Sequence, residues 1–319
     1  MGASGLGSRA IIGKFYAKLE EIGLAAWVNK IGMLFQSDQE SETYKFLGQI
    51  PALREWIGGR QAKGLSENGI TIANKKFEAT LEVLVDEIRR DKTGQVMVRI
   101  NELATRAVQH WAQLVTALII AGEGSTLGLC YDGQFFFDTD HSEGTSGSQS
   151  NDLSLDISGY PVDVARQGSI TKPSPETLEF AILDLVSAIL GFKDNQGQPM
   201  NDGANSFLVM VPVTFMSAAM STLSDKTFGG GRNNSLLSSG FNFELVVNPR
   251  LTWTTELAVF RIDGNVKPII LQEETAIKMD AIAEGTETEF KEDRHLYGVT
   301  ARRNVGFGAW QAACLGTLA

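Results

Sequence analysis

The stretch LGLCYDGQFFFDTDH, residues 127–141, concentrates the side chains of this chain that could do chemistry. It holds Cys130, Asp138, Asp140 and His141, which are residue types that bind zinc or serve as nucleophile, base and carboxylate partner. A zinc site needs about four such ligands around one point. Cys130 and His141 fall on different predicted strands, whose successive side chains point to opposite faces, so convergence is not expected. We therefore interpret the stretch as structural.

The turn chemistry of the same stretch predicts a hairpin. Asp132-Gly133 is the dipeptide that fits a two-residue type I′ turn, and it is flanked by candidate strands at Leu127–Tyr131 and Gln134–Phe137. The remaining histidines, His110 and His295, stand at no ligand-like spacing. A hairpin with an acidic turn is thus favoured over a metal or Cys–His site.

Other motifs give no catalytic reading. The glycine-rich segment GASGLGS (2–8) lacks the preceding strand of a dinucleotide fingerprint, and GGGRNNS (229–235) lacks the lysine of a phosphate-binding loop. The sequence contains no serine elbow, HExxH or CxxC motif. We expect no catalytic, cofactor-binding or metal site, and no cofactor. A hydrolase that uses Asp138, Asp140 and His141 is the alternative from the enzyme class.

Composition limits the class of protein further. The chain has 319 residues, 43% of them hydrophobic, which is enough for a large buried core. Its net charge of -10 argues against a surface that grips nucleic acid, although it permits a protein that encloses it. Two cysteines cannot form a disulfide framework, so a reducing compartment is expected. The apolar run at 114–121 is too short to span a bilayer, and we expect a soluble intracellular protein.

Hydrophobic periodicity predicts two strong helices. Apolar residues recur at helical spacing between Lys92 and Gly122, and Ser174-Pro175 is a cap and first-turn signal for a second helix that ends near Leu190. Residues 11–35 show helical spacing broken by glycines, which predicts a broken helix in an arm and not a packed domain. Another helix is expected at Val213–Leu223.

Residues 54–86 predict a long two-stranded ribbon. Apolar and polar residues alternate from Phe77 to Asp86, the parity changes near Asn74, and Glu67-Asn68-Gly69 is a tight-turn signal. The chain offers this ribbon no obvious local partner. Further strands are expected at 207–211, 241–247, 257–262, 269–272, 278–282 and 297–303. Helices and strands do not alternate regularly, so the fold class is α+β.

This order of parts resembles a tailed-phage major capsid protein of the Hong Kong 97 type, and more closely the major head subunit of Mu-like phages. The resemblance covers most of the chain from about residue 52. It rests on the order of five segments: REWIGGR (54–60), ITIANKKFEATLEVLVDEIRRD (70–91), CYDGQFFFDTDH (130–141), NDGANSFLVMVPVTFMSAAM (201–220) and YGVTARRNVGFGAWQAA (297–313).

The resemblance implies a division of the chain into regions. These are an N-terminal arm (1–52), an extended loop (53–91), a peripheral domain with a spine helix (92–174), an axial domain (175–265) and peripheral strands that return at the end (266–319). It also implies contacts with neighbouring subunits through the extended loop, at Trp56, Arg60, Lys63, Leu65, Glu67, Asn68, Ile70 and Ile72. A second set lies in the axial-domain loop, at Gly229, Gly230, Gly231, Arg232, Asn233 and Asn234.

The implied function is structural. Such a subunit forms pentamers and hexamers of an icosahedral shell, which encloses double-stranded DNA without sequence-specific binding. Portal and scaffolding proteins are the expected partners, no membrane is involved, and the site is the virion after assembly in the host cytoplasm. An encapsulin-like nanocompartment shell is the alternative within the same fold.

Overall fold

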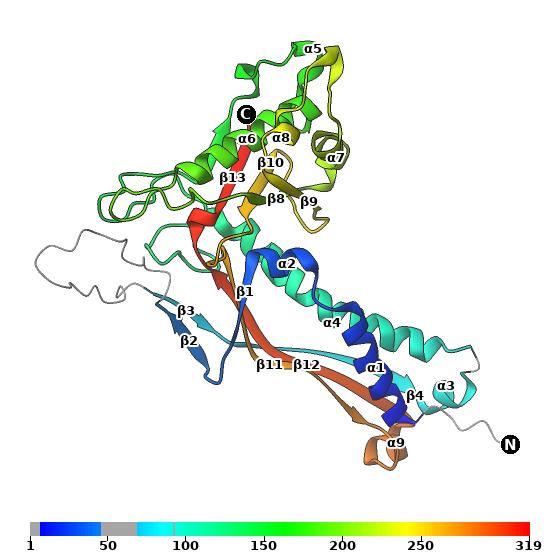
Figure 1. The fold of residues 1–319 in the computed structure, drawn as a ribbon. Coiled ribbons are helices and arrows are strands. Elements are labelled where there is room, and N and C mark those ends of the chain that lie inside the picture. Colours follow the sequence, from blue (N-terminus) through cyan, green and yellow to red (C-terminus); the bar gives the residue numbers. More distant parts are fainter. Residues whose placement is uncertain (1–6, 46–68, 92) are drawn as a thin grey trace, which may run out of the picture.

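The computed structural model describes residues 7–45, 69–91 and 93–319. They form a lower body and an upper body, each built on a β-sheet, and a long helix joins the two (Figure 1). Strands and helices do not follow a regular βα alternation, which confirms the α+β class. Among these described residues no helix is both long and apolar enough to cross a bilayer.

The sheet of the lower body contains a very long strand pair. Its spatial order is β1 (Gly32–Gln36), β11 (Ile269–Ile282), β12 (Arg294–Phe307) and β4 (Lys75–Leu84). β1 runs parallel to β11, whereas β12 is antiparallel to both of its neighbours. The two short strands predicted at 269–272 and 278–282 are one strand, β11, with register shifts between Glu273 and Lys278. The turn between β11 and β12 holds the short helix α9 (Glu287–Glu292).

Helix α4 (Gln95–Ile120) confirms the long helix predicted from the apolar stripe. The Asp91 carboxylate accepts hydrogen bonds from the backbone N–H groups of Gln95 and Val96, each at 2.9 Å, and so satisfies two donors that a helix start leaves unpaired. The helix continues into the 3-10 turn η1 (Ala121–Glu123). Its buried stripe begins in the lower core with Val96 and ends in the upper core with Ile119.

The N-terminal segment packs on this body. Helices α1 (Ser8–Ile22) and α2 (Ala26–Ile31) confirm a broken helix, but the expectation of an unpacked arm is wrong. Ile11 and Phe15 are fully buried in the core that α1 forms with α4 and β11. The apolar stripe of this segment is wide enough to pack against the lower core when the segment is helical. The glycines interrupt the helix but leave the stripe in place.

The ribbon also differs from its prediction. The chain bends at Asn74 as predicted, but β3 (Ile70–Ala73) pairs with β2 (Ser41–Tyr44), outside the predicted limits. Beyond the bend β4 pairs with β12, so residues 75–84 have a partner in their own subunit. The strand ends at Leu84, and α3 (Val85–Arg90) follows, in which Asp86 forms helix-spaced ion pairs with Arg89 and Arg90. The turn signal at Glu67-Asn68 lies outside the described residues.

The upper sheet has the order β5 (Asp152–Leu155), β13 (Ala313–Leu318), β10 (Glu256–Arg261), β8 (Ser206–Val211) and β9 (Asn242–Val247). Helix α6 (Pro175–Gly191) packs on this sheet and starts as predicted, with the Ser174 side chain accepting from Thr177 N–H. Helix α7 (Met216–Ser224) follows the 3-10 turn η3 (Val213–Phe215). Short elements complete this body: η2 (Ile157–Gly159), α5 (Val164–Gln167), β6 (Gly168–Ser169), β7 (Lys172–Pro173), η4 (Gly229–Gly231), α8 (Ser235–Ser238) and η5 (Trp310–Ala312).

The returning strands divide between the two bodies. β11 and β12 join the lower sheet, whereas β13 lies between β5 and β10 in the upper sheet. The chain changes sheets at η5, where Trp310 is almost fully buried.

Candidate functional site

The segment at residues 127–141 does not form the predicted hairpin strands. It is a turn, closed by a hydrogen bond from Gly133 N–H to the Cys130 carbonyl at 3.0 Å and another from Cys130 N–H to the Gln134 carbonyl at 2.8 Å. Gly133 has a φ of 88°, but Asp132 does not share the left-handed region that a type I′ turn requires. The second predicted strand is absent, and its residues Phe136 and Phe137 are instead buried in the core.

The turn places Asp132 against His141. The imidazole Nδ1 donates to the Asp132 carboxylate at 2.6 Å, and the side chains are 0% and 5% exposed. The His141 ring also stacks on Trp310, with centroids 4.0 Å apart and planes at 8°. Removal of one partner of such a buried pair strongly destabilises the fold, because the other partner is left buried without compensation. Sequence reasoning named Asp138 and Asp140 as partners of His141 and missed Asp132, since only the turn geometry reveals it.

The other reactive side chains of this segment make local hydrogen bonds or are buried as neutral groups. Asp138 accepts from the N–H groups of Phe135 at 3.1 Å and Thr139 at 2.7 Å, and Asp140 accepts from the Gln134 amide at 3.0 Å. Burial, and then the charge of Asp132, raise the pKa of the Cys130 thiol well above its ordinary value, so the thiol stays protonated and is a poor nucleophile. In the described ranges no group of three or more His, Cys, Asp and Glu side chains could hold a metal. The segment is suited to packing.

The base of the ribbon is fixed to the lower sheet. Gln272 of β11, fully buried, accepts from the Tyr44 hydroxyl at 2.8 Å and donates to the Ile72 carbonyl at 3.1 Å. A side chain at Gly306 would overlap the Ile72 side chain, so glycine is needed for this close approach. Ile72 is only 4% exposed, whereas Ile70 keeps some exposed surface. The predicted contact residues Trp56, Arg60, Lys63, Leu65, Glu67 and Asn68 lie outside the described residues.

The loop at 229–234 is held more firmly than its glycines predict. The Arg232 guanidinium binds the fully buried Glu179 carboxylate of α6 and lies 3.7 Å from Glu176. Asn234, 2% exposed, accepts from Leu236 N–H and donates to the carbonyls of Thr222 and Asp225. Arg232 and Asn234 therefore anchor this segment to the upper body. Gly229, Gly230 and Gly231 form the 3-10 turn η4, and Asn233 forms an isolated β-bridge with Thr227.

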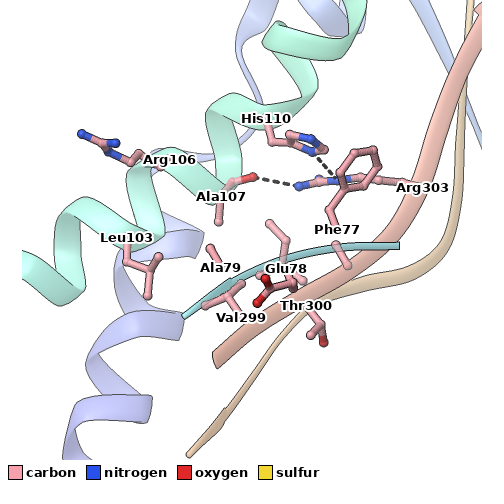
Figure 2. Close-up of a pocket in the computed structure, with 12 residues that line it drawn as sticks. Phe77, Glu78, Ala79, Leu103, Arg106, Ala107, His110, Val299, Thr300 and Arg303 are labelled. Carbon is pink, nitrogen blue, oxygen red and sulfur yellow. Dashed lines mark hydrogen bonds between the residues drawn. The ribbon is translucent and has the colours of Figure 1, made fainter. Parts of the chain in front are cut away.

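A cleft between α4 and the lower sheet is a feature that sequence reasoning missed (Figure 2). Its volume is about 150 Å³, and its walls are mostly apolar side chains: Phe77, Ala79, Leu103, Ala107, Ile277, Val299 and Ala301. Arg303 closes one end and donates to His110 Nδ1 at 3.1 Å and to the Ala107 carbonyl at 2.9 Å. Its Nη1 is buried and finds no hydrogen-bond partner among the residues that the structure describes. The alternation of residues along β12 could have revealed the buried arginine, because Arg303 lies on the same buried face as Tyr297, Val299 and Ala301.

The neutral form of His110 is part of this arrangement. Because an arginine only donates, the His110 Nδ1 must accept, so the ring proton lies on Nε2. Burial, and then the charge of Arg303, lower the pKa of His110 to about 4. Burial likewise lowers the pKa of Arg303 to about 10. The cleft therefore presents a cation at one end of a largely apolar hollow.

Comparison with known sequences relates the chain to one family of proteins. The family described as the Mu-like prophage major head subunit gpT matches residues 11–166 and 254–317. The Mu-like prophage FluMu major head subunit of Haemophilus influenzae is 36% identical over 126 residues, which are 40% of each chain. The major capsid protein of Escherichia phage Mu is 33% identical over 153 residues, 46% of this chain and 49% of the relative. The matched part thus spans less than half the length of these relatives.

Solved structures share the fold over almost the whole chain. A subunit of the bacteriophage JBD30 procapsid superposes with a TM-score of 0.55 at 24% identity and covers 97% of this chain and 74% of its own. A subunit of the cyanophage P-SCSP1u capsid gives 0.53 at 14% identity, with 93% and 89% covered. One from the native GTA particle capsid also gives 0.53 at 14%, with 92% and 89% covered. These similarities confirm the Hong Kong 97-type fold.

Proposed function

The chain belongs to the family of Mu-like prophage major head subunits, and from this membership we propose that it is a structural subunit that assembles in many copies into an icosahedral phage head shell. The observation that carries the proposal is the family match, which includes strands of both sheets. The fold, shared with phage capsid subunits, supports it. A shell subunit needs no catalytic centre, and the buried Asp132–His141 pair is consistent with a packing role.

The two bodies correspond to a division of labour within such a shell. We assign the lower body, with α4 as its spine, to the peripheral domain, and most of the upper body to the axial domain around residues 175–265. The ribbon of β2 and β3 would carry the extended loop over a neighbouring subunit. The base of this ribbon is attached to the lower sheet through the hydrogen bonds of Gln272 to Tyr44 and Ile72. A loop on such a base would hold a neighbouring subunit in a defined position. Residues 229–234 would lie near the symmetry axes.

The proposed role as a shell subunit determines which partners the chain is expected to have. Copies of the chain would form pentamers and hexamers, with separate portal and scaffolding proteins, and the particle would be the virion assembled in the host cytoplasm. With a net charge of -10 per chain, the subunits repel DNA more than they attract it. We propose that the shell encloses double-stranded DNA without sequence-specific contacts.

Electron microscopy and sedimentation of the expressed protein test this function. Closed shells, or capsomers that close with a scaffolding protein present, are the expected result. A variant in which Lys45 is joined to Gly69 through Gly-Ser keeps the Tyr44–Ile70 strand pairing and removes the loop. It should fold, as judged by circular dichroism, and form no complete shells. A small oligomer from the full chain with its scaffold would contradict the proposed function, whereas intact shells from the loop variant would contradict only the loop's role.

A further inference from the structure

Phe290 is an aromatic side chain that the described part of the chain leaves almost entirely exposed. It lies on α9, at the lower tip of the molecule (Figure 1), and is 91% exposed. Its surroundings are acidic, since residues 287–293 hold three glutamates and an aspartate against one lysine. A phenylalanine exposed to this extent gains about 2 kcal/mol or more if another surface removes it from water. Its exposure on a turn at the end of the β11–β12 strand pair makes the ring accessible to another molecule.

The cleft between α4 and the lower sheet has complementary properties. Its volume of about 150 Å³ is comparable with that of an engineered apolar cavity that binds benzene, so one phenyl ring fits. Its lining is apolar, apart mainly from Arg106 and Glu78 and the end formed by His110 and Arg303. The Arg106 side chain is 75% exposed and pairs with the exposed Glu102 carboxylate at 3.0 Å. Among the described residues, Arg303 Nη1 has no hydrogen-bond partner. An acidic segment that carries one ring matches this combination of hollow and cation.

Phe290 cannot reach the cleft of its own subunit. The cleft begins at Val299 and continues past Ala301, five to seven residues along β12 from its start at Arg294, which is about 17–23 Å of strand. Helix α9 is also held in place, because Glu289 binds His295 at 3.2 Å and Arg294 binds Glu82 at 2.7 Å. The ring and the cleft therefore meet only between two copies.

We propose that Phe290 of one subunit inserts into the α4–sheet cleft of a neighbouring copy. The contact joins two different surfaces of the same molecule, and such head-to-tail contacts close into rings when the rotation is suitable. The acidic turn around Phe290 would lie over Arg106 and the guanidinium of Arg303. This inference rests on the proposed shell function and names the residues through which lower bodies hold one another.

Disulfide trapping tests the contact directly. Ala79 is an exposed wall residue of the cleft, and the native Cys130 and Cys314 are buried and do not compete. The double variant Ala79→Cys/Phe290→Cys should give a ladder of covalent multimers on mild oxidation of assembled particles, and reduction should remove it. Particles of either single variant should give no ladder. A disulfide needs Cα atoms about 4.4–6.8 Å apart, so a ladder would show that residues 79 and 290 of two copies are neighbours. Assembled double-variant particles that give no ladder would overturn the inference.

A pair of truncations supplies the energetic test. Phe290→Ala should raise the subunit concentration needed for half-maximal assembly by about tenfold or more, as expected for an aromatic anchor. Filling the cleft with Ala79→Trp should have the same effect. Val98→Ala, which shortens a side chain that is 66% exposed on α4, serves as the matched control and should leave assembly unchanged. Normal assembly by Phe290→Ala overturns this inference alone, whereas a wild-type chain that never assembles removes the proposed function as well.

Discussion

Replacement of Trp111 by alanine should destabilise the subunit by about 3–5 kcal/mol. The side chain is 7% exposed and lies where α4 passes from the lower core to the upper one. A buried aromatic residue hides about 150–250 Å², which at about 25 cal/mol per Å² is worth about 4–6 kcal/mol. Alanine recovers a part of that through its own burial and local relaxation.

Arg303 adds to this cost. Its guanidinium carbon lies 4.8 Å from the centre of the Trp111 ring, so truncation also removes a cation–π contact from a buried charge. Trp111→Phe keeps an aromatic face and should cost less than half as much. The Trp111→Phe variant measures the effect of a smaller aromatic side chain, and its difference from Trp111→Ala measures the effect of losing the aromatic ring altogether.

Urea unfolding followed by circular dichroism measures the effect, at a protein concentration low enough to keep the subunit unassembled. Val98→Ala on the same helix, 66% exposed, should stay within about 0.5 kcal/mol of the wild type. If Trp111→Ala lowered the unfolding free energy by less than about 1 kcal/mol, the indole would not be part of the core and the packing of α4 described above would be wrong.

Three further results are expected. Because the pKa of His110 is lowered to about 4, from an ordinary value near 6.5, the unfolded chain binds the proton first; stability should therefore fall as pH drops from about 6.5 toward 4, and His110→Gln should weaken this loss in unfolding measured at both ends. His141→Ala should cost about 3–5 kcal/mol because it strands the buried Asp132 carboxylate, while elemental analysis should find no metal before or after the change. Arg232→Ala should lower the melting temperature more than Arg232→Lys, since only lysine keeps a charge to pair with buried Glu179.

The sequence was informative where periodicity reports burial directly. The apolar stripe of α4 and the Ser174 cap predicted helices that the structure confirms, because both signals act within one element. Asp132-Gly133 marked a turn, but its flanks are coil since their phenylalanines are buried by distant residues such as Phe307, which stacks on Phe136 with centroids 4.8 Å apart. That contact is a property of the tertiary fold.

Partners distant in sequence account for the other differences. Nothing near Ser41 announces that it belongs beside Ala73, or that β4 pairs with β12 more than 200 residues later. The cleft below α4 arises only once the helix lies on the sheet, and Phe290 becomes conspicuous only when its exposure is known. The resemblance to a family predicted the fold class correctly, and the placement of the N-terminal helices required the structure.

The position of β13 has a consequence for synthesis on the ribosome. The strand lies inside the upper sheet, between β5 and β10, and β12 likewise separates β11 from β4 in the lower one. Neither sheet can close until residues 294–318 have been translated and have left the exit tunnel, because the strands that precede them lie on both sides of β12 and β13. Nascent chains on one messenger therefore hold incomplete sheets while neighbouring chains are being made. Any surface that depends on a complete sheet therefore forms only after these strands have been translated.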